Sequence, residues 1–213
     1  NLGNFGGIVN NSSEGIQIVK DRNRWYAIIV GGNDLAGTPA KIAKLEFGIN
    51  ITNTTPSATS WGNLNNTLSF PVDIHVFKEN GSWYGFVVNA GNNNFTRISF
   101  GQGFSSTPVA TNFTGMGLNY PTGIYVLNKN GYWYAFVANE RSSSITRVDF
   151  GNSLLNNSPT VTNLGSLGGA LTSPRDLHIM QFCDKAIGFV VNANTNNIVR
   201  INFENGLDQA PTA

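Results

Sequence analysis

The stretch that decides the fold is Pro121 to Gly151, PTGIYVLNKNGYWYAFVANERSSSITRVDFG. It reads as an apolar strand, a turn, a second apolar strand, a polar loop and a third strand that ends on glycine. The same order recurs at 71–101, PVDIHVFKENGSWYGFVVNAGNNNFTRISFG, and at 174–204, PRDLHIMQFCDKAIGFVVNANTNNIVRINFE, and a looser copy covers 15–48. The chain is therefore built from tandem repeats.

Four repeats of about 50 residues follow from aligning these strands. Every repeated segment is typical of a strand, and none has the apolar spacing of a helix. A period of this length made only of strands is typical of propeller blades. We therefore predict an all-β fold, a β-propeller of four-stranded antiparallel blades, with repeats at approximately 1–59, 60–111, 112–162 and 163–213.

The strands themselves favour a propeller over a sandwich. In 83–88, WYGFVV, both faces of the strand are apolar, which suits a strand covered on each side by a neighbouring blade. We expect 74–77, 83–88 and 95–100 to pair as adjacent antiparallel strands, joined first by a tight Asn80-Gly81 turn. A fourth strand that follows a proline suits the outer edge of each blade, at Thr55–Trp61, Thr107–Phe113 and Ser158–Leu164.

Composition excludes several functional classes. Charged residues make up 12% of the chain and the formal net charge is +1, too little positive charge for a nucleic-acid surface. No apolar run reaches the roughly 20 residues of a membrane span. The single cysteine, Cys183, cannot form an intrachain disulfide, and we expect a structural thiol there. The chain begins at Asn1 without a signal peptide, so we expect a processed or excised piece.

The repeat resembles the NHL type of β-propeller. The shared pattern is Pro-x-(Gly/Asp)-Ile-x-Val, a turn with Gly, an aromatic and Val-rich strand, an Asn-rich loop, Ile-x-Arg and Phe. The chain departs from the NHL pattern where Asn89, Asn139 and Asn192 replace an Asp after the second strand. Its Asn- and Thr-rich style is similar to propeller repeats of secreted and cell-surface proteins of Bacteroidota, which implies an extracellular or cell-surface location.

Polar side chains recur near the start of the first strand of each repeat. Both histidines occupy one repeat position, each two residues after an aspartate. Because the first strand of a propeller blade lines the central channel, we predict a channel-facing, ligand-binding ring of Gln17, Asp73, His75, Tyr125, Asp176 and His178. Two histidines and two carboxylates would also suit a metal. We favour hydrogen-bonded side chains, with the aspartates capping the entering loop, and expect no metal and no cofactor.

Other recurrent residues suit structural roles. A basic residue repeats on the third strand, at Lys44, Arg97, Arg147 and Arg200, and we expect its stem to pack along the blade. Tryptophan repeats at 25, 83 and 133, which favours blade packing over a sugar platform. The Asn-rich loops lack the carboxylates that calcium prefers, so we expect their side chains to bond their own loops.

No nucleophile elbow, phosphate-binding glycine loop or paired-cysteine motif is present. This favours a non-catalytic binding or adhesion module of a secreted or surface protein, with a protein or glycan partner. One alternative is a lyase or hydrolase that uses a histidine and an acid at the channel mouth. Another is a structural spacer in a long surface protein.

The two ends of the chain fall at the same phase of the repeat. Residues 210–213, APTA, match 158–161, and Asn1-Leu2-Gly3 matches 163–165, so one outer strand is split between the ends. A four-bladed ring can close by pairing such ends. We favour instead a segment of a longer array of the same repeats, which would expose apolar faces on its first and last blades.

Overall fold

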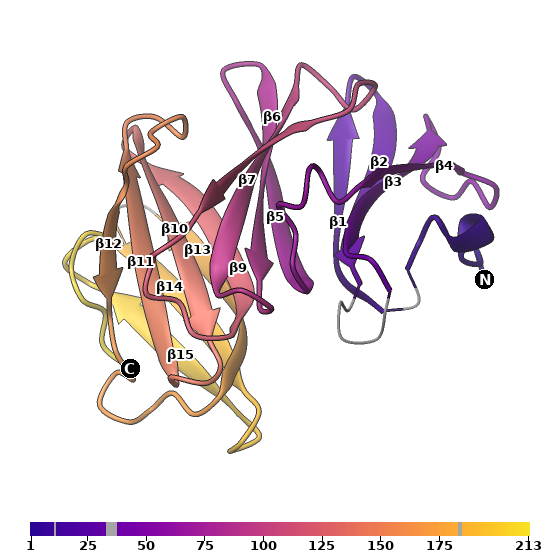
Figure 1. The fold of residues 1–213 in the computed structure, drawn as a ribbon. Helices are drawn as coiled ribbons and strands as arrows, with labels where there is room; N and C mark the ends of the chain where they lie inside the picture. The colour runs from indigo at the N-terminus through magenta and orange to yellow at the C-terminus, as the bar shows by residue number, and fades with distance from the viewer. Residues whose placement is uncertain (11, 33–37, 183–184) are drawn as a thin grey trace. The chain divides into compact units, whose positions relative to one another are not determined.

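The computed structural model describes residues 1–10, 12–32, 38–182 and 185–213. Cys183 thus lies outside the described residues, and so does part of the segment before Lys41. Fifteen strands and one short 3-10 helix, η1 (Phe5–Gly7), make up the described secondary structure (Figure 1). The predicted fold class, an all-β propeller of antiparallel four-stranded blades, is confirmed. Within the described residues no helix has the length and apolarity to cross a membrane.

The N-terminal unit, Asn1–Phe113, holds blades 1 and 2. In each blade the strands pair in chain order, so the last strand forms the edge. Blade 1 consists of β1 (Ser13–Asp21), β2 (Arg24–Gly31), β3 (Lys41–Gly48) and β4 (Ser57–Gly62). Blade 2 consists of β5 (Pro71–Glu79), β6 (Ser82–Asn89), β7 (Asn94–Gly101) and β8 (Val109–Phe113).

The C-terminal unit, Thr114–Ala213, holds blades 3 and 4. Blade 3 consists of β9 (Pro121–Lys129), β10 (Tyr132–Asn139), β11 (Ser144–Gly151) and β12 (Thr160–Asn163). Blade 4 consists of β13 (Pro174–Phe182), β14 (Lys185–Asn192) and β15 (Asn197–Phe203).

The end of the chain takes the place of the fourth strand in blade 4. Thr212 pairs with Asn202 through two backbone hydrogen bonds of 2.8 and 3.0 Å. In blade 3 the equivalent pair is Thr160 with Asp149, so the predicted match of 210–213 to 158–161 is confirmed. Whether the repeats continue into a longer array stays a prediction.

The predicted pairings and turns are also confirmed. In blade 2, β6 pairs antiparallel with both β5 and β7 over the predicted ranges. Asn80 and Gly81 between β5 and β6 have φ of 48° and 82°, the left-handed values that a two-residue hairpin turn requires. From Trp83 to Asn89 every residue of β6 is buried, as its two apolar faces predict.

Each unit has its own apolar core between its two blades. In the N-terminal unit, Ile28 and Val30 of β2 pack with Ile74 and Val76 of β5. In the C-terminal unit, Phe136 and Ala138 of β10 pack with Leu177 and Ile179 of β13 in the equivalent way. The same strand positions thus form both cores, as a repeat built from one packing pattern requires.

A glycine lets the innermost strands approach closely in each unit. A Cβ built on Gly15 of β1 would lie 2.8 Å from the Asp73 Cα and 2.9 Å from the Val72 carbonyl oxygen. A Cβ on Gly123 of β9 would likewise lie 2.8 Å from the Asp176 Cα. No side chain fits at these distances, so the first blade of each unit carries glycine where the second carries aspartate.

Buried asparagines fasten the loops that enter the blades. The Asn139 side chain is fully buried; its Oδ1 accepts the Asn119 N–H at 3.0 Å and its Nδ2 donates to Thr146 Oγ1 at 2.9 Å. Asn89 and Asn192 bond backbone N–H groups 20 residues earlier in the same way. An aspartate in place of Asn139 would lack the Nδ2 group that donates to Thr146.

An ion pair links blades 1 and 2, and it gives a pH prediction. Lys78 Nζ lies 2.7 Å from Oδ1 of Asp21, whose side chain is 7% exposed. Burial alone would raise the pKa of Asp21, but the hydrogen bond from Lys78 and the charges of Lys78 and Arg22 outweigh it, so the pKa lies below its ordinary 3.8.

A carboxyl with a lowered folded-state pKa stabilises the protein above its unfolded pKa and loses that contribution as the pH falls through the folded value. We therefore expect Asp21→Asn to cost on the order of 1 kcal/mol near neutral pH, because Lys78 is partly exposed. The cost should vanish in acid, below the lowered pKa. Urea unfolding at both pH values measures it, with Glu204→Gln as the control. An equal cost at both pH values would contradict the assignment.

Candidate functional site

The predicted ring residues of the N-terminal unit serve mainly its structure. The Gln17 side-chain amide bonds both the N–H and the carbonyl of Val76, so it joins β1 to β5. Asp73 Oδ1 accepts the Ile74 N–H at 2.8 Å, within β5. The His75 ring is half-buried, 5.9 Å from the Phe77 ring between centroids.

In the C-terminal unit the predicted residues come together at a hollow. The Tyr125 and His178 rings meet edge to face with 4.5 Å between their centroids. Asp176 and His178 line a shallow hollow of about 210 Å³. Its remaining walls are apolar: Leu177, Phe189, Val191 and Ile198.

The apolar wall of this hollow is open to solvent. Phe189 is 39% exposed, whereas its counterpart Phe136 in blade 3 is fully buried against blade 4. The two polar side chains at this hollow are exposed as well. Asp176 Oδ1 accepts the Leu177 N–H at 2.7 Å, which fixes the carboxylate at the rim.

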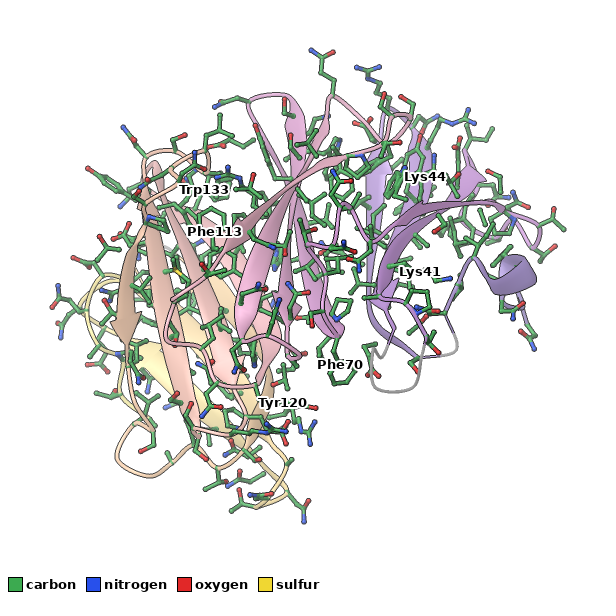
Figure 2. The ribbon with its side chains drawn as sticks, in the orientation of Figure 1. Lys41, Lys44, Phe70, Phe113, Tyr120 and Trp133 are labelled. Atoms are coloured by element: carbon green, nitrogen blue, oxygen red, sulfur yellow. The ribbon has the colours of Figure 1, made fainter. Side chains whose placement is uncertain are left out.

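The recurrent basic residues fix loops of the following blade. Lys44, labelled in Figure 2, donates to the Phe104 carbonyl at 2.8 Å. Arg147 donates to the Leu207 carbonyl at 3.1 Å and to the Gln209 carbonyl at 3.3 Å. The role at these two positions is structural, but it is carried by the buried cationic group and not, as was predicted, by a packed stem. Within the described residues no group of three or more His, Cys, Asp or Glu side chains is placed to hold a metal ion.

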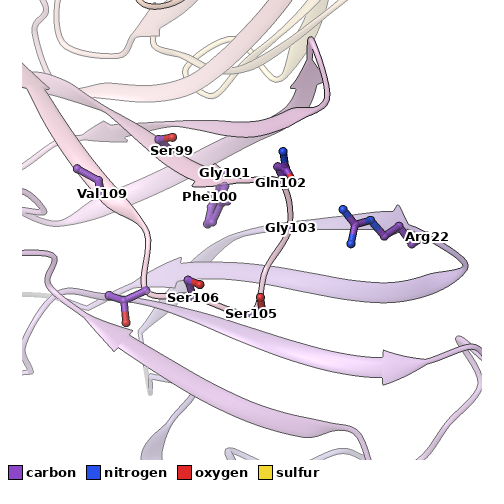
Figure 3. A pocket seen from close by; sticks show the side chains of 10 residues that line it. Arg22, Ser99, Phe100, Gly101, Gln102, Gly103, Ser105, Ser106 and Val109 are labelled. Carbon is purple, nitrogen blue, oxygen red and sulfur yellow. The ribbon is translucent and has the colours of Figure 1, made fainter.

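The hollow of about 480 Å³ in the N-terminal unit is lined mostly by one loop. Its walls are Arg22 from the β1–β2 turn and the segment 99–109 that runs from β7 to β8. Arg22 faces the part of this loop that carries Gly103 and Ser105 (Figure 3). These walls offer hydroxyl and backbone groups and one cation, but no carboxylate.

A third hollow, of about 420 Å³, was not anticipated from the sequence. It lies in the C-terminal unit between the β9–β10 turn and the loop after β15. Tyr132, Tyr134, Asp149, Asp208 and Lys129 line it. Tyr134 recurs as Tyr26 and Tyr84, whereas Tyr132 and Asp208 differ from their counterparts Arg24 and Ser105, and that difference was the available signal.

No protein-family model and no curated protein matches the chain. Solved structures do match: a GH43 β-1,3-galactosidase has a TM-score of 0.61 and 12% identity over 90% of this chain and 43% of its own. The α-L-arabinofuranosidase PaAbf62A from Podospora anserina matches with a TM-score of 0.64 and 8% identity, over 96% of this chain and 68% of the arabinofuranosidase. A GH43_1 enzyme from Xanthomonas citri, complexed with xylotriose, matches with a TM-score of 0.61 and 10% identity, over 96% of this chain and 73% of that enzyme.

These likenesses establish the fold and correct one prediction. The propeller part of the predicted resemblance is confirmed, whereas the NHL-type assignment stays a prediction. The prediction of a non-catalytic binding or adhesion module is wrong, because the matching structures are glycoside hydrolases. The repeat motif misled because its residues report how blades pack, which is the same whether or not a propeller face carries catalytic groups. The chain spans less than half the length of the galactosidase.

Proposed function

We propose that this chain is the propeller part of an extracellular hydrolase that cleaves glycosidic bonds. Its fold is that of the glycoside hydrolases, and the hollow at Asp176 and His178 offers a carboxylate, an imidazole and an exposed aromatic ring on one face. Aromatic faces and a few placed polar groups are what carbohydrate sites use. Polymeric glycans are extracellular substrates, which agrees with the expected location.

The spacing of the two polar groups suggests their roles. Asp176 and His178 are two residues apart on β13, so their side chains leave the strand on one face, from Cα atoms about 6.7 Å apart. Inverting glycosidases hold their two carboxyl groups roughly 6.5–9.5 Å apart, which leaves room for a water molecule, and side chains that start from this backbone spacing can reach such a separation. Phe189, directly opposite His178 on β14, is then placed to stack on the sugar ring.

In this arrangement Asp176 acts as general base and His178 as general acid. The carboxylate takes a proton from water while the water oxygen bonds to the anomeric carbon. The bond from that carbon to the leaving oxygen breaks, and the imidazolium gives its proton to this oxygen. Both groups then exchange protons with solvent. Tyr125 is a positioning residue, since its ring edge packs on the His178 ring.

The test is hydrolysis of β-1,3-galactotriose, xylotriose and nitrophenyl galactoside, arabinofuranoside and xyloside by the whole chain. We expect Asp176→Asn to lower kcat about 100-fold on every substrate that is cleaved, the lower range for a general base. His178→Gln should impair the oligosaccharides far more than the nitrophenyl glycosides, because nitrophenolate leaves without protonation. Proton NMR should show an inverted anomeric product.

Glu204→Gln is the matched control, because it removes an exposed carboxylate from blade 4 outside this hollow. It should leave the rates unchanged, and thermal unfolding should show all three variants folded. No hydrolysis of any of these substrates, or full activity in Asp176→Asn, would contradict the proposed function.

A further inference from the structure

The 420 Å³ hollow beside Tyr132 differs from the equivalent place in the N-terminal unit. Both places have a buried tyrosine as their floor, Tyr134 in one and Tyr26 in the other. The residues around this tyrosine differ between the two units. The C-terminal unit has Tyr132, Asp149 and Asp208 where the N-terminal unit has Arg24, Glu46 and Ser105.

In the N-terminal unit a guanidinium group fills this place. Arg24 Nη2 lies 2.6 Å from Glu46 Oε1, and Arg24 Nε donates to the same oxygen at 2.9 Å. Burial raises the pKa of the neighbouring Tyr26, the Glu46 charge adds to this, and the Arg24 charge opposes it. The guanidinium thus pairs with a carboxylate near the phenol.

In the C-terminal unit carboxylates remain and Tyr132 stands at the position of Arg24. Asp149 accepts the Gly151 N–H at 2.8 Å and Asp208 accepts the Gln209 side-chain amide at 3.2 Å. Within the described part of the chain, no cationic side chain lies within 4.0 Å of either carboxylate. Lys129 also lines the hollow, which leaves two carboxylates there against one ammonium group.

The two carboxylates are held around one point. Burial raises the pKa of Tyr134, the charges of Asp149 and Asp208 raise it further, and the Arg147 charge opposes them, so both carboxylates and this buried guanidinium act on the phenol. Arg147 fixes Asp208 by donating to the carbonyls on either side of it, at Leu207 and Gln209. Tyr132 is 54% exposed, so its ring forms an open wall of the hollow.

We propose that this hollow binds the guanidinium group of an arginine presented by another polypeptide. Carboxylates accept the planar fork of a guanidinium in short charged hydrogen bonds, and the Tyr132 ring offers a face for it to stack on. In the N-terminal unit the equivalent place is occupied by Arg24, an arginine of the protein itself. This site is separate from the hollow at Asp176 and does not depend on the proposed hydrolysis.

The test uses Nα-acetyl-arginine N-methylamide as probe and the uncharged citrulline analogue as its matched control. Titrated into the whole chain, the arginine probe should shift the backbone amide NMR signals of 132–134, 149 and 206–208. We expect a Kd on the order of 1 mM, suited to one small group. The citrulline probe and methyl galactoside should leave these signals in place. Equal shifts from citrulline, shifts from the sugar alone, or no shifts would each overturn the site.

Variants that copy the N-terminal unit sharpen the test. Tyr132→Arg should place a guanidinium against Asp149, fill the hollow from within and abolish the probe's shifts. Asp208→Ser, which copies Ser105, should weaken binding about tenfold. This variant tests the site even if Tyr132→Arg does not fold. Tyr132→Phe keeps the ring and should retain binding. Undiminished binding in both Tyr132→Arg and Asp208→Ser would overturn the site.

Discussion

Trp83→Ala should lower the free energy of unfolding by about 3–5 kcal/mol, the usual range for emptying a buried aromatic site. Trp83 is 8% exposed, and its ring centroid lies 5.1 Å from that of Phe104, within the core between blades 1 and 2. Removing the indole leaves a cavity that this loop residue cannot fill, because Lys44 holds the Phe104 carbonyl in place. Urea unfolding monitored by circular dichroism measures the loss.

Trp133 occupies the same repeat position and is the matched control. From the repeat alone, Trp133→Ala is expected to cost as much as Trp83→Ala. The structure separates them, since Trp133 is only half-buried. We therefore expect Trp133→Ala to cost about 1–2 kcal/mol, because Trp133 is less buried than Trp83 and removes less apolar surface from water. A loss below about 1 kcal/mol for Trp83→Ala would contradict its place in the core.

Gly123→Ala should cost about 3 kcal/mol, although it adds a single methyl group. That methyl would lie 2.8 Å from the Asp176 Cα and 2.9 Å from the Arg175 carbonyl oxygen. These are backbone atoms, so β9 and β13 must separate to admit it, and overpacking of this kind typically costs 1–3 kcal/mol or more. Chemical unfolding of the variant measures the cost.

Gly103→Ala is the control for the glycine itself. Its added Cβ would have only an Asp21 carboxylate oxygen within 4 Å, at 3.4 Å, and its φ is not left-handed. We expect a change within about 0.5 kcal/mol, as for an unremarkable surface position. Similar costs at the two positions would show that Gly123 is not needed for the close approach of β9 and β13.

The sequence predicted the strands well because their signal is local. Apolar strand faces, Asn-Gly turns and prolines before edge strands each act within a few residues, and each of these signals occurs in more than one repeat. The candidate site was harder, because recurrence marks packing more often than chemistry. Gln17 shares a repeat position with His178, yet its amide is taken up by the Val76 backbone, a partner 59 residues away.

The hollow at Tyr132 could not be predicted from residues that recur in the repeats. Its residues come from β9, β10, β11 and the loop after β15, so no spacing within one repeat brings all of them together. Only the packing of blade 4 on blade 3 places Asp208 beside Asp149, through the carbonyls that Arg147 holds. The available clue was a difference between equivalent positions, which becomes informative once the alignment of repeats is known.

The alternation of Gly15 and Gly123 with Asp73 and Asp176 also bears on how such a chain can lengthen. An aspartate-type inner strand set where a glycine-type strand stands would drive its Cβ into its neighbour's backbone. The unit that can be copied is then a pair of blades, a glycine-type blade followed by an aspartate-type blade. Gene duplication or protein design with these repeats should therefore add or remove two blades at a time. Junctions near 113–114, between pairs, should be tolerated better than junctions within a pair.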